Sequence, residues 1–374
     1  MTNSFIQWYR NIIEVGGCLK NGELVLSPYE EVFEEEKTSD SDLRDDDLNF
    51  IYENLCVTLE PELGHKGKDI RAAATNGYNF CFFLDGSLRT KYVGEYCEGR
   101  FSTPVIISEI GVAVVKREMQ KINPYMLRKR LYIIFPHKGS GFITDTTYEK
   151  LNKLKEKLDQ EGSNTRIEFL KKTDIKRDVK YSMLGKARAL MHDFEHEVAL
   201  SLERSSNEWL VMDGAMRTSD FMKLQKTIGL AKSFSRRPML DFQNGKKPLM
   251  LPFYLRNLKE GERSAVFRVV SGGLKGLTFW YIRLRSLHQI EPLEGVVKVD
   301  FNLGSDSLKS EDIKLIDRIS HEVYMLRNPS IYPNRKWLST IYPIRVAEEC
   351  LGCSFTPREI LIRVGGWIKY GIKC

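Results

Sequence analysis

The sequence predicts one α/β domain with insertions, in which a mixed sheet is flanked by helices. Dense apolar runs typical of buried strands recur along the 374-residue chain, as in "GYNFCFFLDGS" and "WLVMDG". Segments with apolar residues at helical spacing lie between these runs, at 145–161 and 181–204. Because no low-complexity linker divides the chain, one domain is favoured over two independent ones.

Residues 1–75 are predicted to form a helical, acidic N-terminal extension, and residues 76–374 the main domain, with inserted helices around 145–205. The extension is predicted from "DDDLNFIYENLCVTLEPEL", which has apolar positions at helix-like spacing. In the main domain, "TPVIISEIGVAVVK" predicts one or two strands, started where Thr103 precedes a proline.

The C-terminal third predicts two further strands and two helices. "LTFWYIRLRSL" and "GVVKVDF" are typical of an antiparallel pair of strands. "TIYPIRVAEECLG" predicts a helix that begins near Pro343, where proline is tolerated in the first turn, and is closed by Gly352. The following "FTPREILIRVGGWIKYGI" predicts another short helix and an apolar tail.

Composition is that of an ordinary globular protein, with 42% hydrophobic and 29% charged residues. The first residues, "MTNSFIQWYRN", lack the basic-then-apolar pattern of a secretion signal, and no apolar run nears the ~18 residues of a membrane span. Seven cysteines at irregular spacing fit a reducing compartment. We therefore expect a cytoplasmic protein with no membrane partner.

The formal charge of +7 is unevenly distributed. Residues 30–47 hold ten acidic and two basic side chains, a net charge of −8, so the rest of the chain carries +15. Such a basic body favours a polyanionic partner. The acidic segment is interpreted either as a solvated surface or as a docking segment for a basic partner.

Two short stretches almost repeat each other, "FFLDGSLRT" at 82–90 and "VMDGAMRT" at 211–218. Each is predicted to be a buried strand that ends in Asp-Gly, where glycine lets the backbone turn away. Asp-Gly is also a common turn dipeptide with no chemistry. However, two carboxylates on neighbouring strand ends would repel unless a cation lay between them. Asp85 and Asp213 therefore predict a site for Mg²⁺ or Mn²⁺, which prefer oxygen ligands.

A metal-dependent phosphodiester hydrolase needs further carboxylates to hold two metal ions. The helix predicted before the second strand offers four: Asp193, Glu195, Glu197 and Glu203. Glu195 shares a helix face with Val198 and Leu202, so we expect it to face the sheet, and Glu197 to face solvent. His192 and His196 have a spacing that could bind zinc, but the HExxH pattern is absent. The lone "CLGC", residues 350–353, is interpreted as packing.

Asp85-Gly86-Ser87, Glu195, Asp213-Gly214 and "YPIRVAEEC" follow one another in the order found in the NurA nucleases. Over residues 75–360 the chain thus resembles this family of archaeal and bacterial DNA-end-processing enzymes, which have an RNase H-like core. The resemblance implies an RNase H-like mixed sheet flanked by helices. It also implies that Asp85, Glu195 and Asp213 are metal ligands.

The resemblance further implies that Tyr342 is an active-site tyrosine near the scissile phosphate. In the family an Ala-His pair follows this tyrosine, and the histidine completes the site. Glu349 and Cys350 stand at those positions here. Glu349 is the candidate replacement ligand, although it points about 100° away from Cys350 on an ideal helix. Cys350 is a soft ligand, poorly matched to Mg²⁺ but less excluded for Mn²⁺.

The resemblance also implies an activity and partners: cleavage of single-stranded DNA or DNA ends with Mn²⁺ or Mg²⁺ in a two-metal site, during double-strand break repair. A homodimer and a hexameric HerA-type ATPase are implied as well. The alternative hypothesis is a catalytically decayed DNA-clamping or ATPase-docking subunit, favoured by the missing histidine. The carboxylates at Asp85, Glu195 and Asp213 argue against decay, because crowded charges cost stability without a function.

Basic side chains offer candidate DNA contacts. Arg89 and Arg217 follow the two aspartates and could pair with the carboxylates or touch the DNA backbone. Residues 231–256 interleave basic residues, Lys232 among them, with aromatic residues, a pattern that suits a single strand. The candidate DNA-binding residues there are Arg236, Arg237, Lys246 and Lys247. A solvated loop with buried phenylalanines is the alternative interpretation.

Overall fold

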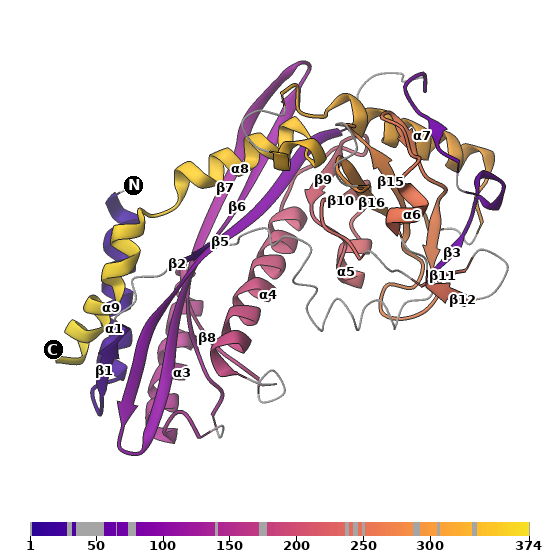
Figure 1. Ribbon diagram of the computed structural model, residues 1–374. Coiled ribbons are helices and arrows are strands. Elements are labelled where there is room, and N and C mark those ends of the chain that lie inside the picture. The colour runs from indigo at the N-terminus through magenta and orange to yellow at the C-terminus, as the bar shows by residue number, and fades with distance from the viewer. Residues whose placement is uncertain are drawn as a thin grey trace.

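A computed structural model describes most of the chain. The described residues are 2–27, 32–34, 56–64, 66–73, 80–138, 141–171, 178–235, 239–241, 246–248, 251–286, 292–304, 307–330 and 335–373. Their strands form one 16-stranded mixed sheet, which helices flank (Figure 1). The α/β class with a mixed sheet flanked by helices is therefore confirmed.

Strand β5 (Phe80–Glu98) lies at the centre of the sheet. It forms an antiparallel meander with β6 (Phe101–Glu118) and β7 (Lys121–Phe135), and β8 (Thr165–Phe169) pairs parallel with β7. On its other side β5 pairs parallel with β9 (Trp209–Asp213), which pairs parallel with β10 (Thr227–Ala231). The antiparallel strands β16 (Val296–Phe301) and β15 (Thr278–Arg283) follow, as the sequence predicts.

Short strands border this core. They are β1 (Glu23–Leu26), β2 (Val32–Glu34), β3 (Cys56–Thr58), β4 (Lys68–Asp69), β11 (Met239–Asp241), β12 (Lys246–Pro248), β13 (Glu262–Arg263) and β14 (Phe267–Val269). The prediction that the first 75 residues are helical is thus wrong for residues 23–26, 32–34, 56–58 and 68–69. Pairing of β3 with β14 and β11 outweighs the helix-like spacing around residue 56. The boundary near residue 75 stays a prediction.

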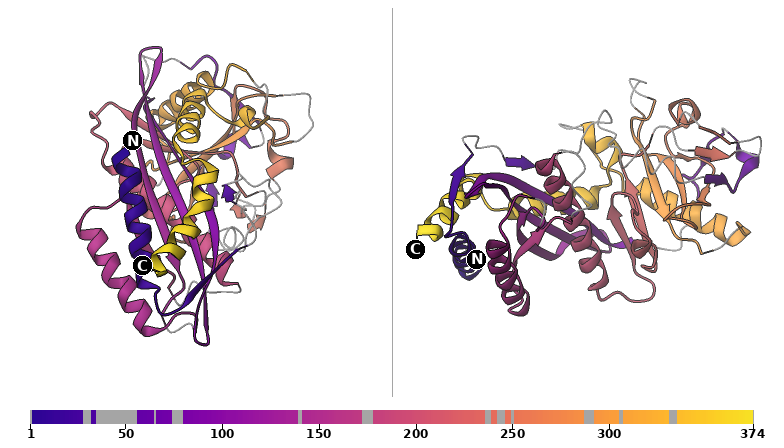
Figure 2. Two further views of the ribbon diagram at one scale, coloured as in Figure 1. Left: turned by 90° about the vertical axis from the view of Figure 1, so that its left-hand side faces the viewer. Right: turned by 90° about the horizontal axis from the view of Figure 1, so that it is seen from below.

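The helices cover both faces and one end of the sheet. They are α1 (Thr2–Cys18), α3 (Asp145–Gln160), α4 (Val179–Leu200), α5 (Ser219–Met222), α6 (Leu251–Leu255), α7 (Ser310–Met325), α8 (Tyr342–Ser354) and α9 (Arg358–Lys373), with the 3₁₀ turns η1 (Pro61–Leu63) and η3 (Arg335–Ser339). The indigo α1 and the yellow α9 lie side by side at one end of the molecule (Figures 1 and 2). Their close approach uses two glycines, since a Cβ on Gly16 would lie 2.9 Å from the Cα of Gly371.

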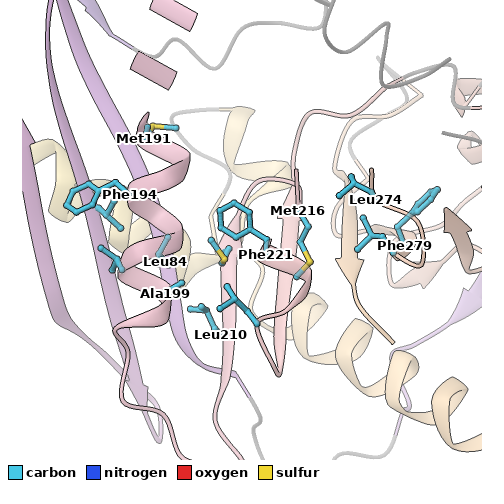
Figure 3. Close-up of a cluster of buried hydrophobic side chains, with 14 of the residues drawn as sticks. Leu84, Met191, Phe194, Ala199, Leu210, Met216, Phe221, Leu274 and Phe279 are labelled. Carbon is cyan, nitrogen blue, oxygen red and sulfur yellow. The ribbon is translucent and has the colours of Figure 1, made fainter. Parts of the chain in front are cut away.

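Alternation along β5 separates two cores, because successive strand residues point to opposite faces. Phe82 and Leu84 belong to a core cluster that includes Phe194 of α4. Figure 3 shows Met191, Phe194 and Ala199 of α4 beside Leu84 and Leu210 of the strands. Phe83 belongs to a second cluster, which includes Ile344 and Leu351 of α8. Helix α4 therefore covers one face of β5 and α8 the other.

The two C-terminal helices differ from the prediction in length. Helix α8 begins at Tyr342, with Pro343 in its first turn as predicted, but it continues past Gly352 to Ser354. The residues predicted as a short helix with an apolar tail form the single 16-residue helix α9. Its buried residues, Leu361, Val364 and Ile368 among them, recur at helical spacing and pack in the cluster that contains α1. Within the described part of the chain, no helix has the length and apolarity needed to cross a membrane.

A buried ion-pair network joins the N-terminal segment to the sheet. Arg263 of β13 is fully buried and donates bidentate hydrogen bonds of 2.6 and 3.0 Å to Glu60, whose side chain is 2% exposed. Its Nε also donates to Asp317 of α7 at 2.7 Å. Glu60 accepts a further bond from the backbone N–H of Val266. The network fixes the chain after β3 against β13 and β14.

Replacing Arg263 by Met is expected to lower the free energy of unfolding by about 3–5 kcal/mol, because Glu60 would remain buried without its counter-ion. Urea titration followed by circular dichroism measures this. The matched control is Arg71→Met, which removes the exposed pair with Asp69 and is expected to leave stability close to wild type. Equal stability of the two variants would contradict the role given to the network.

Candidate metal centre

The pairing of β5 with β9 places the two predicted aspartates side by side. The strands run parallel with Leu84 opposite Met212, so Asp85 and Asp213 are the next residues on adjacent strands. Asp85 lies two positions after Phe83, and Asp213 lies two positions after Val211. Because side chains alternate along a strand, both aspartates point to the face of the sheet that α8 covers. The expectation that the two carboxylates converge is therefore met. Asp85 is buried, with 3% of its surface exposed.

The glycines of the two Asp-Gly dipeptides are required for different structural reasons. After Asp213 the strand ends as predicted, and Gly214 turns the chain with φ of 102°. Strand β5, in contrast, does not end at Asp85 but continues to Glu98, so that prediction is wrong. Gly86 remains in the paired strand, opposite Val112. A Cβ at this position would lie 2.3 Å from Oε1 of Glu195, so Gly86 gives room for that carboxylate.

Glu195 reaches the sheet from α4, as predicted from its helix face. The helix begins after Asp178, whose side chain accepts hydrogen bonds from the backbone N–H groups of residues 180 and 181. Glu195 is 5% exposed, and its Oε2 lies 2.9 Å from Nδ1 of His192. Its carboxylate thus approaches the residue after Asp85 from the α4 face. Among the described residues it is not part of the group of metal-ligand atoms defined next.

The third member of the carboxylate group is Glu348 of α8. One oxygen each from Asp85, Asp213 and Glu348 lie within 4.8 Å of one another, and these residues could hold a metal ion. Sequence reasoning missed Glu348. Its position was visible, because it follows Ile344 by four residues and precedes Leu351 by three, on the stripe of α8 that faces the core.

Glu349, the predicted replacement ligand, lies elsewhere. Its carboxylate accepts a 2.8 Å bond from Nε of Arg345, and its side chain is 57% exposed. The structure does not bring Glu349 into the carboxylate group, because one residue rotates a side chain about 100° around a helix. Tyr342, 42% exposed, is seven residues before Glu349 and shares its side of α8. Cys350 packs on the core, and burial raises the pKa of its thiol.

Other polar residues of α4 have structural partners. Glu197 faces outward, as predicted, and accepts two bonds from Arg130, which hold the pKa of its carboxyl below the ordinary value. His196 packs edge-on against Phe221, with ring centroids 5.0 Å apart. With His192 bonded to Glu195, these contacts give both histidines a role other than zinc binding.

A lysine lies within the carboxylate group. Lys232, the residue after β10, places its Nζ 3.1 Å from Oδ2 of Asp213 and 2.7 Å from Oε1 of Glu348. Its side chain is only 14% exposed. The basic and aromatic pattern of residues 231–256 suggests a DNA contact for Lys232, whereas the structure gives it carboxylate partners. The group therefore already binds one cationic nitrogen, and its hard oxygen donors fit Mg²⁺ or Mn²⁺.

The remaining candidate DNA contacts are only partly described. Arg89 donates to the carbonyl of Thr356 and lies over the ring of Phe355, 4.9 Å from its centroid, which is a structural role at the end of α8. Arg217 is exposed. Arg236 and Arg237 lie outside the described residues. Lys246 and Lys247 belong to β12, with side chains outside the description. Of the acidic segment 30–47, only residues 32–34 are described, as β2.

Gly86→Ala is expected to displace Glu195 and to lower the free energy of unfolding by about 1–3 kcal/mol, because the added methyl overpacks a buried contact. Gly185→Ala is the matched control, since nothing lies within 4 Å of a Cβ there. Within helix α4 that change is expected to stabilise by roughly 0.5–1 kcal/mol. Chemical denaturation of both variants checks the contrast, and a neutral Gly86→Ala would contradict the contact with Glu195.

Comparisons with known proteins add two distant structural likenesses. No protein-family model and no curated protein matches the chain. The NurA nuclease of Sulfolobus solfataricus is similar in structure, with 13% identity and a TM-score of 0.35, over 80% of this chain and 86% of that one. Endonuclease V of Bacillus subtilis has 13% identity and a TM-score of 0.29, over 86% of this chain and 96% of that one. Likenesses of this size do not assign a family, so functional inference rests on the site itself.

Proposed function

We propose that the protein is a divalent-metal-dependent nuclease that hydrolyses phosphodiester bonds of single-stranded DNA or DNA ends. The observation that supports this most is the convergence of Asp85, Asp213 and Glu348, from two strands and a helix, on one small region. Two of them are on adjacent strands by register, so their proximity is built into the sheet. Such a concentration of negative charge is costly unless it serves to bind cations.

Each carboxylate has a defined part in this proposal. Asp85 and Asp213 would hold the ion from the sheet and Glu348 from α8. Glu195 would add a fourth carboxylate from α4, as a two-ion site requires, with His192 fixing its orientation. When bound, Mn²⁺ or Mg²⁺ supplies an activated water and stabilises charge on the phosphate. Tyr342, exposed at the start of α8, would contact a phosphate or a base of the bound strand.

The substrate proposal rests on charge. Outside residues 30–47 the chain carries a net +15, which favours a polyanion. Arg236, Arg237, Lys246 and Lys247 remain proposed DNA contacts on the basis of sequence. A homodimer, a HerA-type ATPase partner and a role in double-strand break repair also belong to the proposal, and the motif resemblance alone supports them.

A second candidate function is supported by Lys232. An ammonium group bonded to Asp213 and Glu348 already compensates part of the negative charge. The same carboxylates could then persist without a metal ion, as in a catalytically decayed DNA-clamping or ATPase-docking subunit. The nuclease remains the leading proposal, because the three carboxylates converge from two strands and a helix on one small region.

Glu348→Gln and Asp213→Asn are each expected to lower the rate of metal-dependent DNA cleavage by roughly 100-fold or more, as is usual when a group that stabilises transition-state charge is lost. Glu349→Gln is the matched control, because that side chain is exposed and paired with Arg345. It is expected to retain wild-type activity. The assay uses end-labelled single-stranded DNA with Mn²⁺, Mg²⁺ or EDTA.

Two results would count against the proposal in different ways. Binding without cleavage by the wild type in every metal would exclude the nuclease and favour the clamp. Loss of activity in Glu349→Gln, with Glu348→Gln unaffected, would instead show that the ligand is Glu349, as the sequence resemblance suggested.

A further inference from the structure

Lys232 occupies an unusual position for a lysine beside a candidate metal centre. It follows the last residue of β10, and Leu230, two positions earlier, pairs with Asp213 of β9. By strand alternation Lys232 points to the same face as Leu230, where α8 lies. Its Nζ then bonds a carboxylate of the sheet and a carboxylate of α8, at 3.1 and 2.7 Å.

The two bonded carboxylates belong to the group that could hold a metal ion. Three carboxylates within 4.8 Å of one another repel, and burial strengthens the repulsion at Asp85, which is 3% exposed, because it lowers the effective dielectric constant. Lys232, 14% exposed, supplies a compensating positive charge from within the chain. A divalent cation in the same group would be repelled by this ammonium and would compete with it for Asp213 and Glu348.

We propose that Lys232 is an internal counter-ion of the carboxylate group, which stabilises the metal-free protein and weakens its affinity for divalent cations. This inference rests on the proposed metal site and adds a residue that sets its affinity. Binding of the ion would release the ammonium from its carboxylate partners. Lys232 would then be a positively charged group beside the site, available to a phosphate of the substrate.

Direct binding of Mn²⁺ without DNA tests the inference, because the free ion is measured by its electron paramagnetic resonance signal. Lys232→Met and Lys232→Gln, which both remove the charge, are expected to bind Mn²⁺ at least about tenfold more tightly than the wild type. Lys232→Arg retains the charge and is expected to stay close to wild type. Lys223→Met, at an exposed lysine paired with Asp220, is the surface control and is expected to change nothing.

Thermal unfolding gives a second, independent readout. Without metal, Lys232→Met is expected to melt below the wild type, because Asp213 and Glu348 lose the ammonium bonded to them. Added Mn²⁺ is expected to raise its melting temperature by more than it raises that of the wild type. If Lys232→Met does not fold, Lys232→Gln, which keeps a polar group at the same place, carries the comparison.

The outcomes separate this inference from the proposed function. Wild type that binds Mn²⁺, with neutral variants that bind equally or more weakly, would overturn the role of Lys232 and leave the metal site intact. No binding by any variant would overturn both. Binding by the neutral variants but not by the wild type would support the counter-ion and favour the catalytically decayed subunit.

Discussion

The parallel pairing of β5 with β9 is the constraint on which the candidate site depends. With Leu84 opposite Met212, Asp85 and Asp213 become neighbours on the same face of the sheet. A slip of one residue would move one aspartate to the opposite face, because side chains alternate along a strand. Apolar residues on both faces hold this register, since Phe83 and Leu84 each pack in a separate core cluster. Core packing therefore decides where the charges lie.

The helices add to this pair from opposite sides. Helix α8 brings Glu348 to the face that carries Asp85 and Asp213, while α4 brings Glu195 to the other face, at Gly86. The absence of a side chain at Gly86 is what leaves room for the Glu195 carboxylate against β5, beside the residue that follows Asp85. Each helix carboxylate has a nearby nitrogen partner, Lys232 for Glu348 and His192 for Glu195. These partners reduce the cost of placing four carboxylates in a mostly buried region.

Local patterns in the sequence were sufficient for the residues whose role depends on one element. Two apolar runs that each lead into Asp-Gly indicated Asp85 and Asp213. Helix periodicity distinguished Glu195, which faces the sheet, from Glu197, which faces outward. The antiparallel pair β15–β16 followed from β-branched and aromatic runs. These features arise from alternation or helical spacing within a short segment, which a single sequence records.

Features that depend on contacts between elements were not visible in the same way. The continuation of β5 beyond Gly86 comes from its long pairing with β6, and the need for glycine there comes from Glu195. The choice between Glu348 and Glu349 depends on a rotation of about 100°. The apolar stripe of Ile344 and Leu351 indicates Glu348, but which residues of the sheet that stripe meets depends on the packing of α8. In the sequence, Lys232 is one of several basic residues in a segment predicted to contact DNA. Its carboxylate partners are 19 and 116 residues away in sequence, so spacing alone could not reveal them.

We propose that Asp85, Asp213 and Glu348 form a binding site for a divalent metal ion. Anomalous diffraction from crystals of the protein grown with Mn²⁺ tests it most directly. We expect a manganese peak within coordination distance of oxygens from all three carboxylates, with Nζ of Lys232 displaced from Asp213 and Glu348. Crystals grown with excess Mn²⁺ that show no peak at this position, with Lys232 still bonded to both carboxylates, would contradict the proposed metal site.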